Sequence, residues 1–212
     1  MKFTKSNILV AIAAVMVTGY LTANVMATQI IQIGSLSIFD AGTIIFPITY
    51  MLGEVVSELW GFRTARRLIL LTFFCQMVFT LFAWIATLVP VPADTIEMQV
   101  AYRQIFGFVP RIMAASVCAF LVGETANAWV MSRLKQHWGG PMWTRTIASS
   151  IVGYCLDTTI FVFIAFAGVV SLKQVLTMIG FQVLAKVLME VCCSTPLAYA
   201  TVAWIRRHLI DA

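Results

Sequence analysis

Long apolar runs dominate the chain, and short polar or basic segments separate them. Most runs reach the roughly 20 residues that an α-helix needs to cross the hydrocarbon core of a bilayer. The pattern predicts an all-α membrane protein, with residues 1–212 forming one domain of six transmembrane helices. The predicted spans are Ile8–Met26, Ile38–Trp60, Leu68–Val89, Ile112–Met131, Thr146–Val170 and Val175–Ile205.

The second run is the least regular of the six. Gly42, Pro47 and Gly53 interrupt it, and proline lacks the backbone N–H that a helix interior requires. We expect this span to be broken near Pro47, with neighbouring helices or a cavity satisfying the freed backbone groups. The longest connection, residues 90–111, is predicted to hold a short amphipathic helix at the membrane surface.

Composition supports the membrane assignment, because 61% of the 212 residues are hydrophobic and only 11% are charged. Ordinary soluble domains are about 25% charged. Cytosolic enzymes, secreted disulfide scaffolds and nucleic-acid binders are thereby excluded. The five cysteines lie in apolar runs without CxxC spacing, so we expect neither a metal site nor a disulfide framework, and no cofactor.

Basic residues are distributed unevenly between the two sets of connections. Ten of them fall at the termini and in the loops after the second and fourth runs, whereas three fall on the opposite side. Because short cytoplasmic loops carry the excess of Lys and Arg, both termini are predicted to be cytoplasmic. The ten are Lys2, Lys5, Arg63, Arg66, Arg67, Arg133, Lys135, Arg145, Arg206 and Arg207; the three are Arg103, Arg111 and Lys173.

Ionisable side chains inside the predicted spans are the candidate functional residues, because each costs about 2.5–3.5 kcal/mol to insert. The amides of Asn24 and Asn127 add neutral hydrogen-bonding groups. Together these side chains predict a polar pocket at the midplane, formed by the last three spans with the broken second span alongside. The candidates are Glu54, Glu58, Glu124, Asp157, Lys186 and Glu190.

Local pairing offers a structural alternative for some of these residues. Lys186 and Glu190 lie four apart on one helical face and could pair with each other. Glu58 lies near a helix end and could pair with Arg63 or Arg66. Asp157 and Glu124 have no local partner, which favours a functional role.

The chemistry of such a pocket suits a small solute that is rich in donors or cationic. A carboxylate accepts two parallel donors, which a guanine-like ring presents at N1–H and its exocyclic amine, and a cationic amine satisfies it equally. Aromatic rings could stack on a planar heterocycle. The candidate rings are Phe46, Tyr50, Tyr154 and Phe181.

Four sets of short stretches carry a family resemblance by their order and spacing. The first is Ala23–Val25, Ala41–Gly42, Phe46–Tyr50, Gly53–Gly61 and Ala65–Arg67; the second is Arg111 with Ala115–Ser116; the third is Ser149–Gly153, Asp157–Phe161 and Ile164–Phe166; the fourth is Lys186–Leu188, Glu190–Val191 and Thr195–Tyr199. Together they resemble the queuosine precursor transporter family, also called the vitamin uptake transporter family, which implies a protein of the cell inner membrane. Glu54 stands where the family pattern usually has Asp, Gln29 replaces a frequent Lys, and Tyr154 stands where Gln is common.

The resemblance implies import of 7-cyano- or 7-aminomethyl-7-deazaguanine, and a fold similar to the substrate-binding components of energy-coupling-factor transporters. We expect Asp157 and Glu190 to bind the donor edge of the base, with Lys186 tuning their charge or meeting the ring carbonyl. Further pocket candidates are Asn24, Tyr50, Glu54, Glu124 and Asn127.

Several alternatives about partners and energy remain open at this stage. The chain could be a vitamin-binding component that needs an energising ATPase, or could act alone or as a homo-oligomer. The acids permit proton coupling, and facilitated diffusion is equally compatible. An intramembrane enzyme is disfavoured, because His137 and His208 lie away from the acids and no Ser–His or HExxH spacing occurs.

Overall fold

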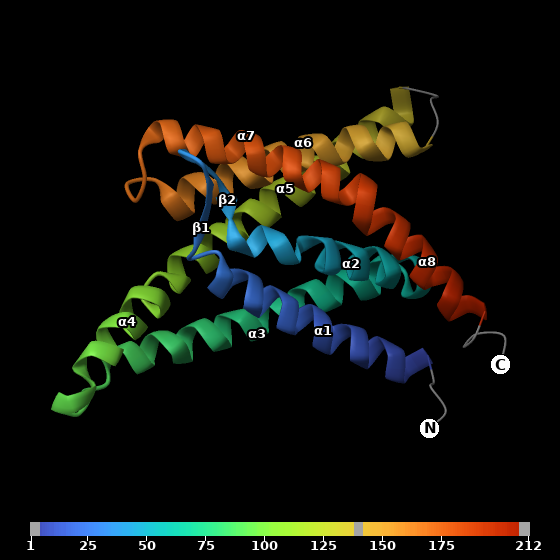
Figure 1. The fold of residues 1–212 in the computed structure, drawn as a ribbon. Helices are drawn as coiled ribbons and strands as arrows, with labels where there is room; N and C mark the ends of the chain where they lie inside the picture. The colour runs from blue at the N-terminus through green and yellow to red at the C-terminus, as the bar shows by residue number, and fades with distance from the viewer. Residues whose placement is uncertain (1–4, 138–141, 208–212) are drawn as a thin grey trace.

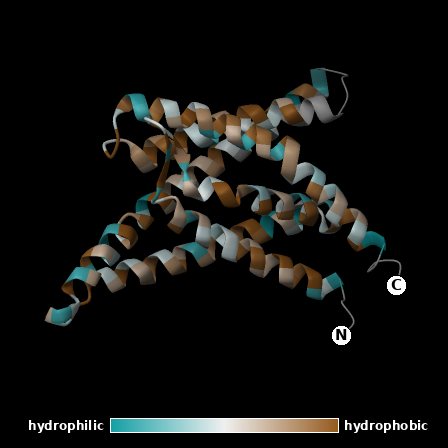
Figure 2. Ribbon diagram, in the orientation of Figure 1, coloured by the Kyte–Doolittle hydropathy of each residue, from teal (hydrophilic) through white to brown (hydrophobic). Residues whose placement is uncertain are grey.

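The computed structural model describes residues 5–137 and 142–207 and is mostly helical. Five helical stretches of this part are long and apolar enough to cross a membrane: Lys5–Met26, Arg63–Leu88, Ala93–Asn127, Ile147–Phe166 and Leu172–Ile205. Figure 2 shows that hydrophobic residues recur along these helices, and many of their large apolar side chains are exposed; Val10 and Phe82, for example, are both 66% exposed. Such outward-facing apolar surface suits lipid rather than water.

The first half of the chain is built from three main helices. Helix α1 covers Lys5–Met26, α2 covers Phe46–Trp60 and α3 covers Phe62–Leu88. The short helix predicted after the third run is confirmed as α4, Ile96–Phe106, and it leads into α5, Val109–His137. Figure 1 shows α1 and α3 running side by side, with α2 beside them.

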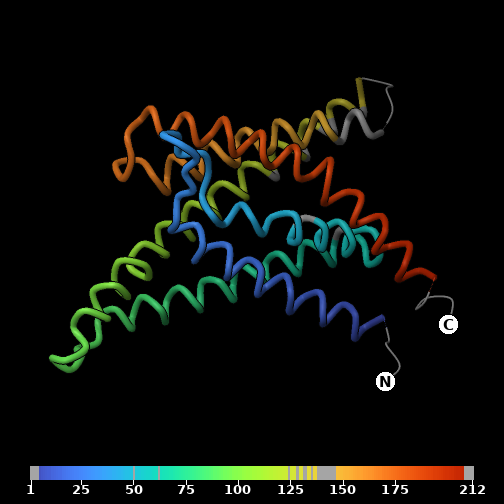
Figure 3. Tube along the Cα trace, in the orientation of Figure 1, coloured from blue at the N-terminus to red at the C-terminus, as the bar shows by residue number. Residues whose placement is uncertain are grey.

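The second half continues with α6, Met142–Phe166, and α7, Leu172–Met189. A π-helical turn at Glu190–Ser194 then joins α7 to α8, Thr195–Ile205. Ser171 caps the start of α7, where its hydroxyl accepts from the backbone N–H of Gln174 and the Gln174 side chain accepts from the Ser171 N–H. The tube in Figure 3 shows α7 and α8 as one bent path.

A β-hairpin follows α1, which the sequence-based prediction of an all-α fold did not include. Strand β1, Ile30–Ile33, pairs antiparallel with β2, Leu36–Asp40, across a turn in which Gly34 has a φ of 61°. Glycine adopts this left-handed conformation without the steric cost of a Cβ. Strand β2 lies along α7, and the Ser37 hydroxyl accepts a hydrogen bond from Gln174 Nε2 at 3.5 Å.

The predicted second span, Ile38–Trp60, is only partly helical. Its first residues form the end of β2, and a 3₁₀ turn at Ala41–Ile45 precedes α2. Pro47 lies in the first turn of α2, where its missing N–H leaves no hydrogen bond unmade. The irregularity therefore precedes Pro47, and α2 has 15 residues, which at 1.5 Å per residue is about 22 Å and less than the bilayer core.

Two separate apolar clusters hold the helices together. One gathers buried residues of α1, α2, α3 and α8, including Met16, Val55 and Ala198. The other gathers residues of α5, α6 and α7, including Ile112 and Val162. The polar side chains described below lie between these clusters, so the packing itself leaves room for a site.

We predict that Gly42→Ala destabilises the protein. A Cβ at Gly42 would overlap the carbonyl oxygen of Ala23 and lie 2.9 Å from Asp40 Oδ1, and overpacking of this kind costs about 1–3 kcal/mol. Thermal unfolding of the detergent-purified protein should show a clear drop in Tm. Gly53→Ala is the matched control, because its Cβ would meet no atom within 4 Å; an equal loss in both variants would contradict the prediction.

Candidate functional site

A cavity of about 70 Å³ lies between the two apolar clusters. Residues from α1, α2, α3, α5, α6 and α7 line it, together with the end of β2 and the 3₁₀ turn after it. Three of its lining residues are ionisable and five are aromatic. The lining residues are Tyr20, Ala23, Asn24, Ala27, Asp40, Gly42, Phe46, Phe73, Ser116, Phe120, Asp157, Phe161 and Lys186.

An ion pair between α6 and α7 crosses this cavity. Lys186 Nζ donates to Asp157 Oδ2 at 2.5 Å, and the two side chains are 2% and 22% exposed. The ammonium also lies 4.8 Å from the centroid of the Phe46 ring, an arrangement that attracts a cation to the ring face. Because both partners are largely withdrawn from water, removing either would leave a poorly solvated charge.

Asp40 is a second carboxylate on the same cavity, and it was not among the predicted site residues. It ends β2, is 1% exposed and interacts electrostatically with Lys186. Its Oδ2 accepts a hydrogen bond from the Thr43 hydroxyl at 3.5 Å. It carried the same signal as the predicted acids, because it lies inside the predicted span Ile38–Trp60.

Amide and hydroxyl groups complete the polar lining. Ser116 Oγ on α5 donates to Asn24 Oδ1 on α1 at 3.0 Å, and also contacts the Ile112 carbonyl. The Asn24 Nδ2 is buried and has no hydrogen-bond partner among the described residues. Buried donors are normally satisfied, so this amide is free to bind a solute. Gln182, one helical turn before Lys186, presents its side-chain amide to Asp40.

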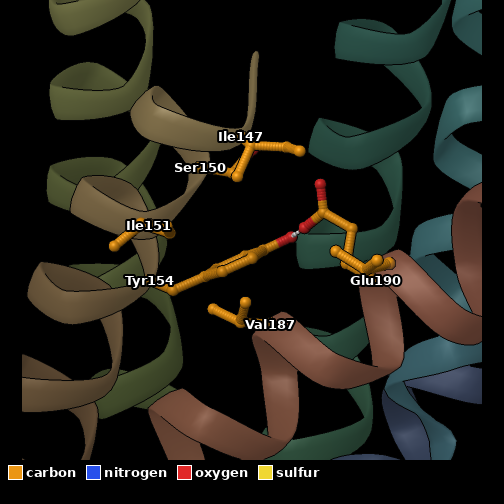
Figure 4. Close-up of a pocket in the computed structure, with 7 residues that line it drawn as sticks. Ile147, Ser150, Ile151, Tyr154, Val187 and Glu190 are labelled. Atoms are coloured by element: carbon orange, nitrogen blue, oxygen red, sulfur yellow. Dashed lines mark hydrogen bonds between the residues drawn. The ribbon is translucent and has the colours of Figure 1, made fainter. Parts of the chain in front are cut away.

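Glu190 and Glu54 form a neighbouring polar cluster rather than part of this lining. The Tyr154 hydroxyl on α6 donates to Glu190 Oε2, as Figure 4 shows. Glu54 on α2 lies within electrostatic range of Glu190 and contacts Thr195 at the start of α8. The alternative in which Lys186 pairs with Glu190 does not hold, because Lys186 pairs with Asp157 instead.

The structure brings together three of the eight predicted site residues around the cavity: Asn24, Asp157 and Lys186. Asn127 lies against Gly153, where α5 and α6 pack closely. The side chains of Tyr50 and Glu124 lie outside the described part. The remaining two, Glu54 and Glu190, lie in the neighbouring cluster.

Two further interpretations from the sequence are corrected. Glu58 pairs with neither Arg63 nor Arg66; its Oε1 accepts from Arg206 Nη2 at 2.5 Å. Of the four rings considered for stacking, Phe46 lines the cavity, whereas Phe181 is 42% exposed on the outer surface. Within the described residues, no group of three or more His, Cys, Asp or Glu side chains is arranged to hold a metal ion.

Comparison with known proteins adds a family to this geometry. A family profile described as "Putative vitamin uptake transporter" matches residues 40–201. A curated relative from Bacillus subtilis (strain 168), described as "Probable queuosine precursor transporter", is 28% identical over 149 residues. The match covers 69% of this chain and 64% of that relative, so the chain spans less than two thirds of the relative's length. No solved structure gives a significant match.

We predict that Lys186→Met destabilises the protein more than Asp157→Asn. The first change leaves the buried Asp40 and the partly buried Asp157 without a cation, whereas after the second Lys186 still interacts with Asp40. Breaking a buried pair costs about 3–5 kcal/mol. The measurement is the Tm of each variant in detergent.

Glu58→Gln supplies the control for this comparison. It removes the Arg206 ion pair, whose side chains are 55% and 59% exposed, and exposed pairs contribute only about 0–1 kcal/mol. A Lys186→Met protein as stable as Glu58→Gln would show that the ammonium does not hold the two carboxylates in place.

Proposed function

The chain belongs to the vitamin uptake transporter family, and we propose that it imports 7-deazaguanine precursors of the tRNA base queuosine across the cell inner membrane. Family membership indicates a transporter rather than an enzyme. The substrate class is suggested by the queuosine precursor transporter that the chain resembles. The solutes proposed are 7-cyano- and 7-aminomethyl-7-deazaguanine, taken up through the lipid bilayer by residues 1–212 acting as one unit.

The observation that carries this proposal is the lining of the cavity between the two clusters. A 7-deazaguanine ring presents two parallel donors on one edge, an acceptor carbonyl beside them, and two flat apolar faces. The cavity offers carboxylates for the donors, an ammonium and a free amide for the carbonyl, and phenylalanine rings for the faces. A pocket that places a few polar groups among aromatic side chains is typical of small-molecule sites.

We assign the donor edge of the base to Asp157 and its carbonyl to Lys186 or to Asn24 Nδ2. Asp157 Oδ2 is held by Lys186, which fixes the orientation of the carboxylate before a solute arrives. Preorganisation of this kind lowers the entropy that binding must overcome. The Phe46 ring, which has the Lys186 ammonium over one face, is proposed to fix the plane in which the bound base lies.

The cluster of Glu54, Tyr154 and Glu190 is proposed to line the route between the cavity and the cytoplasm. Glu190 remains a proposed ligand, engaged when the base leaves the cavity rather than while it rests there. The π-helical turn at Glu190–Ser194 adjoins the start of α2, since Ser194 Oγ donates to the Pro47 carbonyl at 3.2 Å. Movement of this junction would give alternating access to a central site.

For topology, we propose six crossings with both termini in the cytoplasm. Three crossings are the single helices α1, α2 and α3. The fourth is α4 together with α5, the fifth is α6, and the sixth is α7 together with α8. Helix α2 is then a short crossing completed by the hairpin and the 3₁₀ turn. The start of α1 and the end of α8 lie at the same end of the molecule (Figure 1), where the excess of basic residues is also found.

The first test is restoration of queuosine in a cell that cannot make the precursor. At low external precursor, the chain should restore queuosine in tRNA, whereas Asp157→Ala and Glu190→Ala should abolish the rescue because each removes a proposed ligand. Glu58→Gln, an exposed acid on the same protein, should rescue fully. Immunoblots of membranes control for expression, and full rescue by both alanine variants would contradict the site.

The second test asks whether the chain needs an energising ATPase, as a vitamin-binding component would. The purified chain in liposomes should accumulate labelled precursor up to the external concentration without ATP or any partner. The measurement is the label retained after filtration, and empty liposomes give the background. Transport that appears only after an ATPase partner is added would favour the alternative.

A further inference from the structure

The charges around the cavity do not balance. Asp40, Asp157 and Lys186 are the ionisable residues among those that line it, so two carboxylates share one ammonium. Lys186 Nζ lies 2.5 Å from Asp157 Oδ2, which makes Asp157 its main partner. Asp40 interacts with Lys186 only at longer range, and within the described residues it takes part in no ion pair.

Burial makes this imbalance significant. Asp40 is 1% exposed, so water cannot solvate its charge as it would at a surface. Its other partners are neutral: the Thr43 hydroxyl at 3.5 Å, the side-chain amide of Gln182 and the backbone N–H of Gly42. An ionised group withdrawn from water costs several kcal/mol unless it is paired. A cation entering the cavity would relieve this cost.

We propose that the cavity selects 7-deazaguanine bases whose 7-substituent carries a protonated amine, and that Asp40 binds the ammonium group. The inference rests on the proposed function and names a preference within it. At neutral pH an aminomethyl group is a primary ammonium, whereas a nitrile at the same position is uncharged. With the amine bound, the cavity holds two carboxylates and two cations, and the charge-assisted hydrogen bond to Asp40 forms in a water-poor setting.

Asp157 and Asp40 are assigned different roles because their surroundings differ. Asp157 is oriented by Lys186 and leaves Oδ1 without an ion-pair partner among the described residues, which suits the neutral donors of the ring edge. Asp40 lacks such a cation of its own, which suits a charged donor. The base is thereby recognised by Asp157 and the substituent by Asp40.

The experiment compares three labelled bases in liposomes that contain the wild-type chain. These are 7-aminomethyl-, 7-cyano- and 7-hydroxymethyl-7-deazaguanine, the last being an uncharged match for the aminomethyl group in size. We expect the aminomethyl base to have a half-saturating concentration about tenfold lower than the hydroxymethyl base, as one charge-assisted hydrogen bond would give. This comparison needs no variant, so a folding defect cannot confuse it.

Asp40→Asn then identifies the residue responsible, because asparagine keeps the shape of the side chain without its charge. The preference for the aminomethyl over the hydroxymethyl base should fall to about one in this variant. Asp94→Asn, an exposed acid in the connection before α4, is the matched control and should keep the wild-type preference.

Three results would overturn the inference. Equal half-saturating concentrations for the three bases in the wild type would show that the cavity does not respond to the charge. An unchanged preference in Asp40→Asn would show that Asp40 is already neutralised by a bound proton or that another group binds the amine. Uptake of none of the three bases by the wild type would remove the proposed function as well, so the two failures are distinguishable.

Discussion

The burial of one ammonium between two carboxylates is the constraint on which this structure depends. Lys186 is 2% exposed and Asp40 is 1% exposed, so each charge relies on the others rather than on water. Their positions join three distant parts of the chain: the end of the hairpin, α6 and α7. The polar centre therefore connects the end of the hairpin to the helix pair α6 and α7.

Close backbone contacts make this centre geometrically feasible. Gly42 lets the chain after β2 approach the end of α1, which places Asp40 beside Asn24 on the cavity. Gly123 and Gly153 do the same between α5 and α6, and a Cβ at Gly123 would lie 2.7 Å from the Cβ of Asp157. In membranes small residues allow helices to approach closely. Here the close approach of α5 and α6 also fixes the position of Asp157 on the cavity.

Hydropathy and the scarcity of charge predicted most of the helices and three of the cavity residues from the sequence. Asp157 and Lys186 stand out because a charge within an apolar run needs a partner. The hairpin escaped prediction because its strands are only four and five residues long and lie between helices without a clear alternation. The burial of Asp40 was not predicted either. It arises because α7 packs on β2 and α1 packs on the turn that follows, and hydrophobic periodicity carries no information about such contacts.

The Lys186–Asp157 ion pair shows how a neighbouring helix overrides local spacing. Lys186 near the end of α7 and Glu190 at the start of the π-helical turn are four residues apart and share one helical face, but that face is opposed by α6, which runs antiparallel to α7. Asp157 lies opposite Lys186, and Tyr154, three residues earlier on α6, lies opposite Glu190. Lys186 and Glu190 therefore each have a partner on α6. The Lys186–Asp157 ion pair lies at the cavity, and the Tyr154–Glu190 hydrogen bond lies in the neighbouring polar cluster. The same interface with α6 therefore contributes to both sites.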